Sequence, residues 1–100
     1  MRAARVDGNH VQVVEALRRA GMTVQSLAGV GKGCPDLLVG FRGLNVLLEV
    51  KDGEKPPSAR QLTVDETEWQ QTWGGQVVTV GHAETAVNAV LVHCKALGKI

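Results

Sequence analysis

Residues 34–52 read CPDLLVGFRGLNVLLEVKD, and the predicted fold is built around this segment. Two short apolar runs, Asp36–Phe41 and Asn45–Lys51, flank an Arg42-Gly43 pair. Runs of this length that are rich in Leu and Val are typical of strands, and a glycine-containing pair between them indicates a tight turn. We therefore expect a β-hairpin. Because both runs are almost continuously apolar, we expect both strands to lie centrally in a sheet with covered faces.

The rest of the chain carries helix and strand patterns in alternation. Asn9-x-x-Gln12 and Thr63-x-x-Glu66 have the spacing of capping boxes, which open helices. The expected elements outside the hairpin are a helix from Asn9 that ends at Gly21, a strand over 22–27, a flexible loop over 28–33, a loop over 52–60, a helix from 63 to about 73, a strand over 76–80 and a helix over about 83–97. The resulting order αβββαβα predicts an α/β domain with a mixed sheet flanked by helices, since strand-helix-strand crossovers cover sheet faces.

The composition indicates one domain over residues 1–100, with a loose basic segment over 1–8. The formal net charge is +1, so a nucleic-acid partner would need a local basic patch. Cys34 and Cys94 lie far apart, which suggests neither a zinc site nor a disulfide framework. The N-terminus lacks an apolar signal region, and no apolar run reaches membrane-spanning length. We therefore expect a cytoplasmic protein.

Three ionisable side chains that could take part in catalysis are expected to lie close together on this scaffold. Glu49 and Lys51 are two apart on one strand, so they project from the same face. The hairpin then places Asp36, early in the first strand, beside Glu49, late in the second. Two neighbouring carboxylates repel each other, and Mg²⁺ relieves this by taking one or two carboxylates together with waters and substrate phosphate. The Val50 carbonyl could add a ligand, and Lys51 could orient or deprotonate a water or stabilise charge on a phosphate. This chemistry points to phosphodiester hydrolysis.

Each part of this constellation also has a structural interpretation. An E-x-K triplet at a strand end is commonly an exposed ion pair, worth ~0–1 kcal/mol. A Pro-Asp pair is commonly turn chemistry. The combination of both at this spacing, within this element order, favours the catalytic interpretation.

The segment GCPDLLVGFRGLNVLLEVKDGE resembles motifs II and III of the PD-(D/E)XK nuclease superfamily. Within it, the chain is similar to stand-alone phage-type VRR-NUC domains, which themselves resemble archaeal Holliday junction resolvases. The resemblance extends from about Asp7 to Ala89 through VDGNHVQVVEALRRAG and SARQLTVDETEWQQTWGG. It implies a restriction-endonuclease-like fold in a bacterial or phage-infected cell. It also implies an Mg²⁺- or Mn²⁺-dependent DNA endonuclease that acts on branched DNA such as Holliday junctions. Asp36 and Glu49 would be metal ligands and Lys51 the catalytic lysine.

One position departs from the family pattern. Many relatives carry a glutamate in the first helix that helps to bind metal, and here the position falls at Asn9 or His10, with Glu15 too far along the helix. His10 could replace it, since Mn²⁺ accepts imidazole more readily than Mg²⁺ does. An exposed residue in the first turn is the alternative for His10. Asn9 is better interpreted as a helix cap than as a ligand.

Further residues are candidates for DNA contact. The loops near the site carry cations that could bind phosphates without reading sequence, and a glutamine precedes the second helix; these candidates are Lys32, Arg42, Lys55, Arg60 and Gln61. Solvated surface charge and a loop connector are the alternative interpretations. Trp69 and Trp73 share a helix face, and we expect them to pack in the core rather than to stack on bases.

Two other functions are compatible with the sequence. The missing glutamate in the first helix favours a non-catalytic DNA-binding module, and a purely structural partner in a phage particle is a third possibility. A four-way junction needs two symmetry-related cuts, so the nuclease interpretation predicts a homodimer. Apolar positions that could serve a partner are Val11, Val14, Val87, Val90 and Leu91.

Overall fold

A computed structural model describes residues 8–100, and the predicted loose segment over 1–8 lies outside this range except for Gly8, an exposed turn residue. The predicted order of elements is confirmed. The elements are α1 (His10–Arg19), β1 (Thr23–Ser26), β2 (Leu37–Phe41), β3 (Leu44–Val50), α2 (Val64–Thr72), β4 (Val77–Val80) and α3 (Ala83–Ala96), with a short 3₁₀ turn over Pro57–Ala59.

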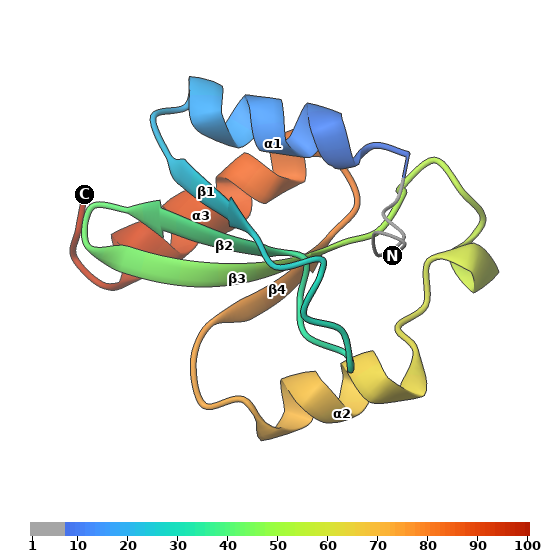
Figure 1. The fold of residues 1–100 in the computed structure, drawn as a ribbon. Helices are drawn as coiled ribbons and strands as arrows, with labels where there is room; N and C mark the ends of the chain where they lie inside the picture. The colour runs from blue at the N-terminus through green and yellow to red at the C-terminus, as the bar shows by residue number, and fades with distance from the viewer. Residues whose placement is uncertain (1–7) are drawn as a thin grey trace.

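The four strands form one mixed sheet in the order β1-β2-β3-β4 (Figure 1). β2 runs antiparallel to both β1 and β3, and β4 runs parallel to β3. The parallel pair follows from the β3-α2-β4 crossover, because a helix between two strands returns the chain in the same direction. The two apolar runs of the hairpin are the two central strands, as predicted.

The turn between β2 and β3 sets the register of the hairpin. Arg42 and Gly43 both have positive φ, 51° and 79°, as a two-residue type I′ turn requires. The ladder therefore runs from Phe41 opposite Leu44 to Leu37 opposite Leu48. One step further along, Asp36 lies opposite Glu49. A local turn thus determines which residues meet at the far end of the hairpin.

One face of the sheet carries the hydrophobic core. The side chains of alternate strand residues point to this face, where α1 and α3 pack over the sheet and against each other (Figure 1). The fully buried members include Val13, Leu17, Leu37, Val39, Val46, Leu48, Val90 and Cys94.

The core also decides which apolar helix residues remain for a partner. The expectation that Val90 could serve a partner is wrong, because its side chain has no exposed surface and belongs to the core. Val14, Val87 and Leu91 are partly buried against the core. Val11 is 62% exposed and stays a candidate.

Helix α2 lies on the opposite face of the sheet (Figure 1). It begins with the predicted capping box, in which the Glu66 backbone N–H donates to the Thr63 hydroxyl at 3.1 Å. None of its residues is buried, and within the described residues it makes only sparse contacts with other elements. The expectation that Trp69 and Trp73 pack in the core is therefore wrong. The two indoles stack on each other instead, with ring centroids 4.5 Å apart, and Trp73 is 49% exposed.

The start of α1 differs from the prediction. Asn9 precedes the helix but forms no capping hydrogen bond with it. Its amide group instead donates to the carbonyl oxygens of Lys51 at 3.1 Å and Gly81 at 2.7 Å, beyond the ends of β3 and β4. Among residues 8–100, no helix is long and apolar enough to cross a membrane.

Candidate functional site

The centre of the site is the pair of carboxylates at the open end of the β2–β3 hairpin. Asp36 precedes β2, and its Oδ2 atom accepts a hydrogen bond from the Val50 backbone N–H at 2.7 Å. Glu49 lies near the end of β3 and is 3% exposed, the only charged residue in the described part of the chain that is buried. The sequence prediction that these two side chains converge agrees with this geometry.

Glu49 is held in an environment that disfavours its charge. Burial raises the pKa of Glu49 to about 9, and the nearby charges of Asp36 and Glu66 and a hydrogen bond with Asp36 act in the same direction. The Lys51 ammonium acts in the opposite direction and lowers this pKa. The Oε1 atom of Glu49 is buried and has no hydrogen-bond partner within residues 8–100. A buried acceptor without a donor is costly, so this oxygen is a ready ligand for a cation.

Lys51 lies between two carboxylates. Its Nζ atom is 3.7 Å from Oε2 of Glu49 and 2.8 Å from Oε1 of Glu66, and its side chain is 14% exposed. The shorter of these contacts is a charge-assisted hydrogen bond, which fixes the ammonium more firmly than a surface ion pair would. Lys51 therefore presents an oriented ammonium at the edge of the two-carboxylate site.

Glu66 is the site residue that sequence reasoning missed. The capping-box spacing predicts its contact with the Thr63 backbone N–H, and its Oε1 atom does accept that bond at 2.8 Å. The same oxygen also accepts from Lys51, which no local pattern predicts. Burial alone would raise the pKa of Glu66, but the hydrogen bonds from Lys51 and Thr63 outweigh it and lower the pKa. Glu66 is therefore a charged group that ties the start of α2 to Lys51.

The donor set fits Mg²⁺ or Mn²⁺ with a small number of protein ligands. No group of three or more His, Cys, Asp or Glu side chains within residues 8–100 could together hold a metal ion. Asp36 and Glu49 supply two carboxylates, which is the number that Mg²⁺ usually takes alongside water and phosphate. The Val50 N–H points to Asp36, and in a regular strand the carbonyl of the same residue points to the same side. Asp36, Glu49 and Val50 are thus the residues that would hold the ion.

His10 is not gathered into such a ligand group. Its Nδ1 atom is buried without a hydrogen-bond partner in the described residues, as is the Oδ1 atom of Asn9. The amide of Asn9 is already engaged with the backbone beyond β3 and β4. The first-helix position therefore carries two orphaned polar atoms but no carboxylate.

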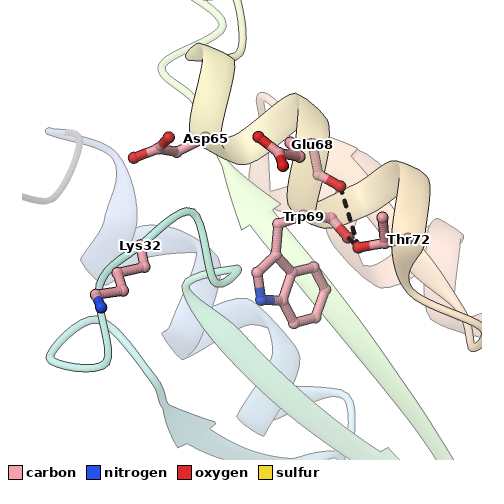
Figure 2. A pocket seen from close by; sticks show the side chains of 5 residues that line it. All are labelled: Lys32, Asp65, Glu68, Trp69 and Thr72. Atoms are coloured by element: carbon pink, nitrogen blue, oxygen red, sulfur yellow. Dashed lines mark hydrogen bonds between the residues drawn. The ribbon is translucent and has the colours of Figure 1, made fainter.

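The predicted DNA-contact residues are scattered. Arg42 does not flank the site, because the turn that pairs Asp36 with Glu49 places Arg42 at the other end of the hairpin, over the ring of Phe41 at 5.6 Å. Lys32 lines a surface pocket together with two carboxylates of α2, Asp65 and Glu68, and in Figure 2 its side chain points away from both. The pocket therefore also carries negative charge, which disfavours a phosphate inside it.

The loop after β3 carries the remaining three candidates. Lys55, Arg60 and Gln61 are all exposed. The Arg60 Nε atom donates to the Lys55 carbonyl at 2.7 Å, which joins the two ends of the loop around the 3₁₀ turn. Lys55 and Arg60 are therefore the two predicted cations that lie in the loop directly following Lys51.

Cys34 lies next to the carboxylates without being a nucleophile. Burial raises the pKa of its thiol, and the charges of Glu49 and Asp36 raise it further. A thiol that is protonated at neutral pH is a poor nucleophile. The site therefore offers carboxylate and ammonium chemistry rather than thiolate chemistry.

No family model, characterised protein or solved structure matches this chain. The fold and the site together define a small α/β protein with a two-carboxylate, one-lysine cluster, centred on the buried Glu49, at the open end of a central hairpin.

Proposed function

We propose that the protein is a metal-dependent DNA endonuclease of the PD-(D/E)XK type, similar to stand-alone VRR-NUC domains. The observation that carries the proposal is the buried Glu49 carboxyl paired with the partly buried Asp36, with Lys51 beside them. A surface E-x-K ion pair would leave its glutamate in water, whereas Glu49 is 3% exposed and one of its oxygens has no hydrogen-bond donor among residues 8–100. Keeping such a group in a small domain costs stability, which is typical of a functional site.

In this proposal the three residues have distinct tasks. Asp36 and Glu49 would hold Mg²⁺ or Mn²⁺, with the Val50 carbonyl as a third protein ligand. Such an ion would supply positive charge that polarises the phosphodiester and makes water at the site more acidic. Lys51 orients the attacking water and donates to the phosphate oxygen on which negative charge develops. Glu66 is a positioning residue, because it acts on the reaction only by holding Lys51.

A nuclease assay tests this proposal directly. Purified protein is incubated with four-way junction, nicked and linear duplex DNA, with Mg²⁺, with Mn²⁺ and with EDTA. We expect cleavage only with a divalent ion, most strongly at the branched substrate. Asp36→Asn, Glu49→Gln and Lys51→Ala should each reduce the rate at least ~100-fold. Glu84→Gln is the matched control, since this exposed glutamate lies on α3 at the other face of the sheet. Full cleavage by Asp36→Asn in Mg²⁺ would overturn the assignment.

A non-catalytic DNA-binding module is the second candidate. It is favoured by the first-helix position, where Asn9 is engaged with backbone carbonyls and no carboxylate joins Asp36 and Glu49. This candidate predicts DNA binding without cleavage in either metal. The same assay, combined with a gel-shift measurement, separates the two functions.

A further inference from the structure

A pocket adjoins the two carboxylates on the same face of the sheet. It has a volume of about 390 Å³ and lies where α2 stands off from β2 and β3. We call it the tryptophan pocket, and its main lining residues are Leu27, Leu38, Leu47, Trp69, Trp73 and Gln76. Figure 2 shows the indole of Trp69 projecting from α2 toward the strands. The volume falls in the range of small-molecule sites, ~300–1,000 Å³.

The pocket lies on the same face of the hairpin as the proposed metal site. Leu38 is two residues after Asp36, and Leu47 is two residues before Glu49, so these four side chains share one face of the hairpin. Two residues along a strand span about 7 Å. A nucleobase is separated from its own phosphate by a single sugar. A phosphate at the carboxylate site therefore brings its base, or that of its neighbour, to the mouth of the pocket.

The chemistry of the lining suits a flat, uncharged ring with polar edges. Trp69 and Trp73 stack on each other, and the 49% exposure of Trp73 leaves aromatic surface available. Asn45 and Gln76 also line the pocket, and their amide groups form no hydrogen bonds with other described residues. Side-chain amides recognise base edges by paired donor and acceptor groups.

Among the described residues, no charged side chain lines the tryptophan pocket. A phosphate would lose its hydration there without gaining a cation, whereas a neutral ring does not need one. The part of a nucleic acid that suits the space between α2 and the sheet is therefore a base that has left its stack.

We propose that the tryptophan pocket binds an unpaired nucleobase next to the phosphate to be cleaved. This inference rests on the proposed function for the identity of the ligand as DNA. It specifies the substrate as duplex DNA with a displaced or unpaired base, which branch points and bulges provide at lower cost than intact duplex does. Trp69 and Trp73 stack on the base, and Asn45 and Gln76 contact its edge.

Binding measurements test the pocket without requiring cleavage. The probes are a duplex with one bulged adenine and the same duplex fully paired, in Ca²⁺, with a gel to show that the DNA stays intact. Trp69 and Trp73 are the only tryptophans of the chain, so their fluorescence reports on the pocket. We expect the bulged duplex to bind roughly 5- to 100-fold more tightly and to quench this fluorescence, whereas the paired duplex leaves it unchanged.

Variants separate stacking from a general loss of structure. Trp73→Ala should abolish the preference for the bulge, and Trp73→Phe should restore most of it because a ring remains. Gln76→Ala should keep the preference for a bulge but weaken discrimination among the four bulged bases. Val92→Ala, at an apolar α3 residue that is 64% exposed, is the control and should match the wild type. Circular dichroism checks that each variant is folded.

The outcomes distinguish this inference from the proposed function. Equal affinity for both duplexes with unchanged fluorescence overturns the pocket, even where Mg²⁺-dependent cleavage is observed. A preference for the bulge that depends on Trp73, without any cleavage in Mg²⁺ or Mn²⁺, supports the pocket and overturns the nuclease. Conversion of a dimer to a monomer by Trp73→Ala, with no preference for the bulge, identifies the pocket as a self-association surface and overturns the inference.

Discussion

Replacing Glu49 with glutamine should stabilise the metal-free protein at neutral pH. The wild-type carboxyl is buried against Asp36, and its pKa is raised from 4.5 to about 9. The protein has the full contribution of such a glutamate to its unfolding free energy below pH 4.5, where the carboxyl is protonated in both the folded and the unfolded state. That stability is lost as the pH rises from 4.5 toward 9, because the unfolded chain releases a proton that the folded protein keeps. The neutral glutamine has the same shape and carries no such dependence.

The size of the effect follows from the pH window. A pH of about 7.5 is roughly three units above the pKa of 4.5 in the unfolded chain. At ~1.4 kcal/mol for each unit, the wild type loses at most about 4 kcal/mol of unfolding free energy by this pH. Reorganisation of Asp36 and Lys51 around the charge lowers this figure. We therefore expect Glu49→Gln to gain at least about 1 kcal/mol, or a rise in Tm of roughly 4 °C or more for a domain of this size.

Thermal unfolding measured in EDTA at pH 5 and pH 8 provides the assay. The difference in Tm between Glu49→Gln and wild type should be small at pH 5 and large at pH 8. Comparing two proteins at each pH cancels the contributions of the titrating groups that do not interact with Glu49. Mg²⁺ should then raise the Tm of the wild type more than that of the variant, because a ligand stabilises only the state that binds it. Parallel Tm values for the two proteins across the whole pH range would refute the reasoning, and Glu84→Gln should show such parallel behaviour.

Three further predictions concern the surroundings of the site and the assembly. Glu66→Gln keeps an acceptor for the helix cap but removes the charge opposite Lys51. We therefore expect kcat to fall about 10-fold, or ~1.4 kcal/mol, at constant KM and with little change in Tm. A proportional loss of stability and rate would show that Glu66 serves only the fold. Gly33→Ala should destabilise the protein by about 1–3 kcal/mol in urea unfolding, because Gly33 has a φ of +82° and a Cβ there would overlap the Asp65 carbonyl oxygen, whereas Gly29→Ala, which meets open space, should cost little. The protein should sediment as a homodimer at micromolar concentration, and a single 10.6 kDa species that persists with junction DNA would contradict this.

Local patterns were sufficient for the hairpin and for the pair of carboxylates within it. The apolar runs and the Arg42-Gly43 turn define the register within a few residues of chain. Because the side-chain direction alternates along a strand, this register alone brings Asp36 and Glu49 to the same face. The same reasoning, applied fully, excludes Arg42 from the site, since a turn and the open end of its hairpin lie at opposite ends.

Local patterns gave wrong predictions where a side chain contacts a residue that is distant in the sequence instead of a near one. Asn9 has the spacing of a cap, but its amide finds two backbone carbonyls beyond β3 and β4. Trp69 and Trp73 have the spacing of a buried face, but α2 stands off from the sheet and the two rings stack on each other. Spacing indicates that such residues share a surface of a helix. It does not indicate what lies opposite that surface.

The order of elements, the central hairpin and the convergence of Asp36, Glu49 and Lys51 can all be predicted from local patterns, because each depends on alternation and turn chemistry over neighbouring residues. Long-range packing is responsible for the burial of Glu49, with an oxygen that has no partner among residues 8–100, and for the contact that Glu66 makes with Lys51 from another element. It also produces the pocket beside them. These features depend on how far α2 lies from the sheet, and that distance is set by packing between segments far apart in the chain.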